Sequence, residues 1–155
     1  MLFRDTMKVH GIVFLIVIGA LLFAPAVSAK IVETKDGYVV STVDTSSRLQ
    51  SVIPISSASI SQGQTQRYSS YIPNGKTAFT ADLNWGAPSN SLSLTINAPD
   101  AALGPYYDAA DGRTDGRINL RISKSGGLAS GTWWSHIYGY SVTGSQGYSY
   151  TAAVS

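Results

Sequence analysis

The sequence predicts an all-β protein, a single antiparallel β-sandwich of the jelly-roll type that follows a cleaved signal peptide. Several short segments alternate apolar and polar residues between turn residues, which is typical of strands with one buried and one solvated face. No segment after the signal keeps a helical period long enough to predict a helix. We therefore expect a signal peptide over residues 1–29, a β-hairpin and extension over residues 30–56 and a β-sandwich over residues 57–155.

Residues 1–29 have the three parts of a secretory signal peptide. A short basic start precedes an apolar run over residues 12–23, and the small residues Val27-Ser28-Ala29 provide a cleavage site. The alternative is an uncleaved membrane anchor, but the apolar run is short for a membrane span of ~20 residues. We therefore expect cleavage before Lys30 and a secreted or cell-surface protein without a membrane anchor.

Charge and cysteine content exclude several classes of protein. The chain of 155 residues holds 11 Lys and Arg against 9 Asp and Glu, and removing Arg4, Lys8 and Asp5 with the signal leaves 9 against 8. This near-neutral balance argues against binding to nucleic acid or to an anionic membrane. Cysteine is absent, so the exported domain must be stable through its apolar core alone.

The first part of the mature chain predicts a hairpin. Residues 31–34 and 38–41 flank Asp36-Gly37, a dipeptide suited to the positive φ angles of a tight turn. The next apolar run, residues 49–55, contains Pro54. Because proline cannot donate a backbone hydrogen bond, this run is predicted as an edge strand or a connecting segment.

Four further segments predict strands of the sandwich. Residues 65–72 lead into a turn at Pro73-Asn74-Gly75, and residues 76–85, 91–97 and 117–123 alternate apolar and polar side chains. Alternate residues of a strand share one face, so each of the last three segments has an apolar face for the core. The residues predicted to face the core are Phe79, Ala81, Leu83, Trp85, Leu92, Leu94, Ile96, Ile118, Leu120 and Ile122.

Two aromatic-rich stretches, residues 131–140 and 147–154, predict the closing hairpin of the sandwich. One face of the second stretch is formed by Tyr148, Tyr150, Ala152 and Val154. On the first stretch we assign Trp133 and Ile137 to the core, because they are the bulky apolar pair. This choice places Gly139 where a neighbouring backbone comes close.

Five motifs of this chain occur together in a known family. They are residues 60–65 (ISQGQT), 82–86 (DLNWG), 90–96 (NSLSLTI), 107–112 (YDAADG) and 131–140 (GTWWSHIYGY). Together they resemble the bacterial and archaeal pre-peptidase C-terminal domain over about residues 57–154. The resemblance implies a small β-sandwich jelly roll of the kind appended to secreted proteases and other exported proteins. Its relatives include the collagen-binding domains of clostridial collagenases.

The chain departs from this family in two places. Many members have Asp-x-Asp where this chain has Ser91-Leu92-Ser93, so no acidic role is carried over to that strand. The collagen-binding relatives bind calcium through an acidic N-terminal segment, whereas Glu33, Asp36 and Asp44 are scattered here. The resemblance therefore implies the fold and leaves the ligand open.

The scarcity of catalytic residues predicts that the protein is not an enzyme. His10 lies in the signal, which leaves His136 as the one histidine of the mature chain. A Ser-His-Asp triad would have to use His136 on a strand face, and no Gly-x-Ser-x-Gly motif is present. One histidine without a cysteine cannot supply the usual ligands of zinc.

An acidic loop holds the candidate metal ligands. Asp108, Asp111 and Asp115 offer carboxylates to calcium, with carbonyls and water to complete an oxygen shell. The alternative is an ordinary turn whose charge is neutralised by Arg113 and Arg117. We therefore expect no cofactor, with calcium at this loop as the alternative.

The best candidate for a binding surface is the outward face of residues 131–140. Alternation places four residues on this face, namely Trp134, His136, Tyr138 and Tyr140. Aromatic rings offer flat apolar area with polar tips, which suits sugar rings or an extended peptide. The alternative is that residues 30–55 cover this strip and bury it as a second small core.

Taken together, these features predict a secreted, non-catalytic module that binds an extracellular polymer or protein, or assists a secreted partner. The alternative is a structural or assembly protein of the envelope, whose strand edges pair with other copies. Nucleic acid and membranes are not expected partners. The ligand and the oligomeric state do not follow from the sequence.

Overall fold

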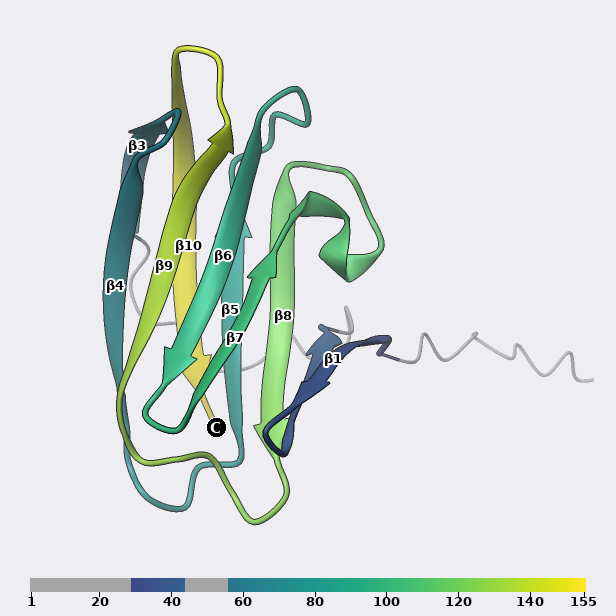
Figure 1. The fold of residues 1–155 in the computed structure, drawn as a ribbon, viewed down its shortest axis with the longest axis vertical. Coiled ribbons are helices and arrows are strands. Elements are labelled where there is room, and N and C mark those ends of the chain that lie inside the picture. Colours follow the sequence, from purple (N-terminus) through teal and green to yellow (C-terminus); the bar gives the residue numbers. More distant parts are fainter. Residues whose placement is uncertain (1–28, 44–55) are drawn as a thin grey trace, which may run out of the picture.

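The computed structural model describes residues 29–43 and 56–155 (Figure 1). The signal peptide predicted over residues 1–29 lies outside these ranges except for residue 29. The segment predicted over residues 49–55 lies entirely outside them. Within the two described ranges, no helix is long and apolar enough to cross a membrane.

Ten strands and one 3₁₀ turn form the described part of the chain. The strands are β1 (Ile31–Lys35), β2 (Tyr38–Thr42), β3 (Ser56–Ser61), β4 (Thr65–Ile72), β5 (Ala78–Asn84), β6 (Ser91–Ala98), β7 (Ala101–Tyr106), β8 (Arg117–Lys124), β9 (Gly131–Ser141) and β10 (Ser145–Val154). The 3₁₀ turn η2 spans Asp108–Asp111.

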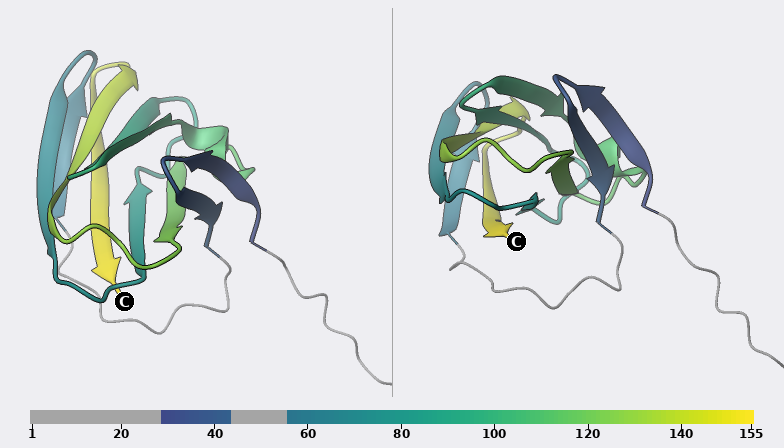
Figure 2. Two further views of the ribbon diagram at one scale, coloured as in Figure 1. Left: turned by 60° about the horizontal axis from the view of Figure 1, so that its bottom comes forward. Right: turned by 90° about the horizontal axis from the view of Figure 1, so that it is seen from below.

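The strands form two sheets that pack face to face (Figures 1 and 2). One sheet has six strands in the order β1-β2-β8-β5-β10-β3, and the other has four in the order β4-β9-β6-β7. All pairs of neighbouring strands are antiparallel. The prediction of an all-β antiparallel sandwich is confirmed.

The N-terminal hairpin belongs to the sandwich. β1 and β2 pair around Asp36-Gly37, whose φ angles are +50° and +79°. β2 also pairs with β8, so the hairpin adds two strands to one edge of the six-stranded sheet. Tyr38 and Val40 on β2 are fully buried in the common core. The hairpin is therefore not a separate extension in front of the sandwich, because its apolar face packs inside it.

The core lies between the two sheets, where the sequence places it. All ten residues predicted to face inward are buried, nine of them on β5, β6 and β8 and the tenth, Trp85, directly after β5. Trp133 on β9 is 1% exposed, and its ring centroid lies 5.6 Å from that of Tyr38 and 5.3 Å from that of Phe79. The Trp133 indole N–H donates to the carbonyl of Ala129 at 2.9 Å, so its one polar atom is satisfied.

The prediction that residues 131–140 and 147–154 pair as a hairpin is wrong. β9 pairs with β4 and β6, whereas β10 pairs with β3 and β5 in the other sheet. The short link over residues 142–144 therefore crosses from one sheet to the other. The two aromatic strands meet through their buried faces, where the Tyr150 hydroxyl donates to Ser135 Oγ at 2.5 Å.

Gly139 lies where β9 meets the turn between β3 and β4. Its N–H donates to the carbonyl of Gln64 at 3.0 Å, and its carbonyl accepts from Gly63 N–H at 2.9 Å. A Cβ at this position would collide with the backbone oxygen of Ser61. The close backbone approach predicted at Gly139 is confirmed.

Replacing Gly139 by Ala should lower the free energy of unfolding by about 1–3 kcal/mol, because backbone must move to make room for the new Cβ. Gly147 on β10 is the matched control, since no atom lies within 4 Å of a Cβ built there. Urea denaturation should show a lower midpoint for Gly139→Ala and an unchanged one for Gly147→Ala. Equal midpoints for both variants would contradict the close approach.

Candidate binding surface on the four-stranded sheet

The outward face of β9 presents the predicted aromatic strip to solvent. Trp134, Tyr138 and Tyr140 are 44%, 38% and 52% exposed, and His136 between them is half-buried. The β1–β2 hairpin lies in the opposite sheet and does not cover them. The alternative of a covered strip is therefore wrong as far as residues 30–43 are concerned, and residues 44–55 lie outside the described ranges.

The strip belongs to a larger surface, which we call the outer face. It consists of the outward side chains of β4, β9 and β6, together with Tyr107 just beyond β7. Six large hydrophobic or aromatic side chains are exposed in the described part of the chain, and all but Ile31 lie on this surface. These five are Tyr71, Tyr107, Trp134, Tyr138 and Tyr140.

Polar side chains flank the rings on both sides of β9. Trp134 lies opposite Ser69 on β4 and opposite Asn97 on β6. His136 lies opposite Arg67 on β4 and Thr95 on β6. The outer face thus combines an aromatic row with hydrogen-bonding groups along its length, although the sequence alone does not reveal which strands provide them.

Tyr107 extends the aromatic row across β6. Its ring centroid lies 4.8 Å from that of Tyr140, with an interplanar angle of 66°. β6 lies between β9 and β7, so this contact spans the strand. Ser93, which lies opposite Tyr138 on β6, is only 5% exposed. Tyr107 and Tyr140 therefore form one continuous aromatic patch, although they are 33 positions apart in the sequence.

Arg67 provides the only charge among the described outward residues of β4, β9 and β6. His136 remains uncharged at neutral pH, because burial and then the Arg67 guanidinium lower the pKa of the imidazole below its ordinary 6.5. Its Nδ1 lies 3.5 Å from the Asn97 side-chain nitrogen. No carboxylate faces outward from these three described strands, so the imidazole has no partner of the kind that a catalytic triad requires.

In the acidic loop over residues 108–115, the carboxylate of Asp108 accepts hydrogen bonds from the backbone that follows it. Asp108 is 6% exposed, and its Oδ1 accepts hydrogen bonds from the backbone N–H groups of Asp115, Gly116 and Arg117 at 3.0–3.2 Å. Asp111 Oδ1 accepts from the N–H of Arg113 at 3.1 Å. These contacts explain the loop as a self-capped turn.

The three aspartates do not converge as metal ligands. No group of three or more His, Cys, Asp or Glu side chains within residues 29–43 and 56–155 is arranged to hold a metal ion. Arg117, predicted to neutralise the loop, instead forms a bidentate ion pair with Asp82 at 2.8 and 2.6 Å. Burial raises the pKa of Asp111, and its neighbours Asp115 and Asp108 add to the rise. Calcium binding by Asp108, Asp111 and Asp115 stays a prediction.

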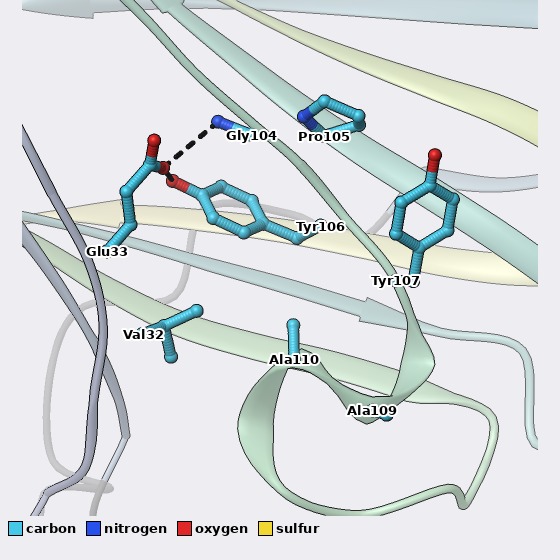
Figure 3. A pocket seen from close by; sticks show the side chains of 8 residues that line it. All are labelled: Val32, Glu33, Gly104, Pro105, Tyr106, Tyr107, Ala109 and Ala110. Atoms are coloured by element: carbon cyan, nitrogen blue, oxygen red, sulfur yellow. Dashed lines mark hydrogen bonds between the residues drawn. The ribbon is translucent and has the colours of Figure 1, made fainter.

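An open pocket borders the outer face at its β7 side (Figure 3). It has a volume of ≈ 460 Å³ and lies between β1 and the segment from β7 to η2. Its lining consists of Val32, Glu33, Gly104, Pro105, Tyr106, Tyr107, Ala109 and Ala110. Tyr107 is shared between this pocket and the outer face. No local sequence pattern predicts this pocket, because Glu33 and Gly104 are 71 residues apart in the chain.

Glu33 is held firmly in this pocket. Its Oε2 accepts hydrogen bonds from the N–H of Gly104 at 3.2 Å and from the Tyr106 hydroxyl at 2.5 Å (Figure 3). Burial, and then the hydrogen bond to Glu33, raise the pKa of Tyr106 well above its ordinary range. The phenol therefore stays protonated and remains a donor to the carboxylate.

Comparisons with known proteins assign no family. No protein-family model matches the chain, and no curated protein matches its sequence. Among solved structures, PliG of Aeromonas hydrophila, a periplasmic inhibitor of g-type lysozyme, matches with 19% sequence identity and a TM-score of 0.43. The match covers 66% of this chain and 85% of PliG. A similarity of this size assigns neither a family nor an activity.

Replacing Arg67 by Gln should raise the pKa of His136 towards 6.5, because one of the two causes of its depression is removed. Because the pKa of His136 is lower in the folded state, its imidazole binds a proton more readily in the unfolded chain. The free energy of unfolding therefore falls as the pH drops from 6.5 towards the folded-state pKa. The Arg67→Gln variant should lose less stability over this range. An NMR titration of the imidazole measures the pKa, and Arg121→Gln, on β8 of the other sheet, is the control. An unchanged or lower pKa in Arg67→Gln would contradict the coupling.

Replacing Asp108 by Ala should lower the free energy of unfolding by roughly 1–3 kcal/mol, because three backbone N–H groups lose their acceptor. Asp115→Ala is the matched control, since the Asp115 side chain is exposed. Thermal unfolding of both variants should show a loss for Asp108→Ala alone, with or without millimolar calcium. A calcium-dependent rise in the wild-type Tm that Asp115→Ala abolishes would instead support the metal site.

Proposed function

We propose that this protein is an exported, non-catalytic module that binds a partner protein outside the cytoplasm through its outer face. The observation that carries this proposal is the concentration of exposed aromatic side chains on one sheet. Five of the six exposed large hydrophobic or aromatic side chains in the described ranges lie there. Export rests on the predicted signal peptide over residues 1–29.

The composition of the outer face supports a protein partner. The cores of protein interfaces are enriched in Tyr, Trp and Arg and depleted in Lys, Glu and Asp. The outer face carries four tyrosines, Trp134 and Arg67, with serine, threonine and asparagine between them. Tyr, Trp and Arg are also the residues that most often dominate binding energy, so Trp134 and its neighbours are the expected hot spot.

The size and rigidity of the outer face support the same conclusion. β9 has 11 residues and β4 and β6 have 8 each, which extend over roughly 36 Å and roughly 26 Å at ~3.3 Å per residue. With neighbouring strands ~4.8 Å apart, these three strands cover about 430 Å² in projection, roughly half of the ~800 Å² per partner of a standard interface. Because the buried faces of these strands pack against the core, the rings are held in place before binding, which lowers the entropic cost of association.

Side chains of β1 make self-assembly through the β7 edge less favourable than binding through the outer face. Two backbone groups of the edge strand β7 are occupied by side chains of β1: Lys35 Nζ donates to the carbonyl of Ala102 at 2.7 Å, and Gly104 N–H donates to Glu33. An edge covered in this way is protected against pairing with another copy. Membership in the pre-peptidase C-terminal family stays a prediction, and its members' association with exported proteins agrees with the proposal.

Replacing Trp134 or Tyr138 by Ala should weaken partner binding by about 30-fold each, the effect of losing about 2 kcal/mol at a hot spot. Stability should change little, since both side chains are exposed. Mature protein immobilised on a resin would capture its partner from secreted and envelope proteins of the source organism. Kd values would then be measured for the wild type and each variant with the captured protein.

Ile31→Ala is the matched control, because Ile31 is 63% exposed but lies on β1, away from the outer face. It should bind as the wild type does. Equal affinities of wild type, Trp134→Ala and Tyr138→Ala would contradict the proposal. Retention on a purified cell-wall polysaccharide that the same two substitutions abolish would replace the protein partner by a sugar polymer.

A further inference from the structure

The geometry points to a second element of recognition: the pocket between β1 and β7 receives a lysine or arginine side chain of the partner protein, with Glu33 as its anionic anchor. This inference rests on the proposed function, because the partner must lie on the outer face to reach the pocket. It adds a chemical requirement that the outer face does not impose, namely a basic side chain at one edge of the partner's contact surface.

The charge in the pocket is unbalanced. Glu33 Oε2 accepts two hydrogen bonds, whereas Oε1 has no hydrogen-bond partner among the described residues. The ion pairs within residues 29–43 and 56–155 are Arg117–Asp82 and Lys124–Asp100, so neither involves Glu33. The nearest lysine along β1, Lys35, bonds to the carbonyl of Ala102. A carboxylate in partly apolar surroundings binds a cationic donor strongly, because charge-assisted hydrogen bonds are about twice as strong as neutral ones.

The walls of the pocket fit the stem of a basic side chain. Val32, Pro105, Ala109 and Ala110 supply apolar surface, and Figure 3 shows the rings of Tyr106 and Tyr107 on opposite sides of the chain segment that follows Pro105. Lysine and arginine bury their methylene groups along apolar surface while the charged head seeks a polar partner. The volume of ≈ 460 Å³ is within the usual range of ligand pockets.

A bare metal ion does not fit this site as well. One carboxylate cannot provide the oxygen ligands that calcium or magnesium takes, and among the described residues Glu33 belongs to no group of three or more His, Cys, Asp or Glu side chains that could hold a metal ion. A cation carried on an apolar stem uses both the charge and the walls. The pocket chemistry therefore selects a basic side chain.

The position of the pocket links it to the outer face. Tyr107 lines the pocket and also packs its ring against Tyr140. Glu33 lies beyond β7 at one edge of the four-stranded sheet, and Arg67 lies on β4 at the other edge. A partner that spans the face thus meets a negative charge at one end and a positive charge at the other. This arrangement orients the partner, because like charges in the reversed orientation would repel.

The pocket can be tested without the partner. Nα-acetyl-lysine amide is titrated into ¹⁵N-labelled mature protein, with Nα-acetyl-norleucine amide as the uncharged probe of similar stem. The lysine probe should give saturable shifts at the amides of Gly104 and Ala110, and the norleucine probe should bind about tenfold more weakly. Equal binding of both probes, or no saturable shift with lysine, would overturn the inference.

Two variants assign the effect to Glu33 and to the pocket. Glu33→Gln keeps an acceptor for Gly104 and Tyr106 but removes the charge, and should weaken the lysine probe about tenfold. Asp36→Asn removes an exposed charge from the turn of the same hairpin and should have no effect. Ala110→Leu fills the pocket and should abolish binding of the lysine probe. Unchanged lysine binding in Glu33→Gln or Ala110→Leu would overturn the inference.

The same titration separates this inference from the proposed function. Trp134→Ala should leave the lysine probe unaffected, because Trp134 does not line the pocket. Loss of partner capture in Trp134→Ala together with lysine binding lost in Glu33→Gln supports both. If the outer-face variants capture partner normally while Glu33→Gln still loses the lysine probe, the proposed function fails and the basic-side-chain pocket stands.

Discussion

Alternation of side chains along β9 is the constraint on which both the core and the outer face depend. Trp133 packs against Tyr38 and Phe79 and donates its indole N–H to Ala129, which holds the register of the strand. A slip by one residue would move every inward side chain to solvent. With Trp133 and Ile137 inward, Trp134 and Tyr138 must point outward. The exposed aromatic row is thus a direct consequence of core packing, and it has a rigid support.

The N-terminal hairpin closes one side of the sandwich and at the same time forms the pocket. Tyr38 donates to Asp100 at 2.6 Å, and Lys124 pairs with the same carboxylate, which lowers the pKa of Asp100. β1 and β7 are edge strands of different sheets, and the side chains of Glu33 and Lys35 join them. These side-chain hydrogen bonds connect the two sheets at β1 and β7, which are not paired with each other through their backbones. The anionic group beside the outer face is therefore a product of the same contacts that complete the fold.

The parts of the fold that depend on a local pattern could be predicted, and those that depend on pairing could not. The inward faces of residues 76–85 and 117–123 follow from alternation, which involves only neighbours in sequence. The link over residues 142–144 is short enough for a hairpin, yet β9 and β10 each find two partners elsewhere. Tyr107 joins the predicted strip for the same reason, since its contact with Tyr140 depends on how β6 and β7 are placed.

The sequence by itself determined the all-β class, the core face of each central strand and the outward set Trp134, His136, Tyr138 and Tyr140. These features follow from the alternation of side chains within one strand, which involves only residues that are neighbours in the sequence. Only the tertiary structure decided that residues 30–43 leave this set uncovered, that further tyrosines extend it and that Glu33 forms a pocket beside it. Strand order brings together residues that are distant in the chain. It depends on the packing of the whole core, and no local pattern of residues encodes it.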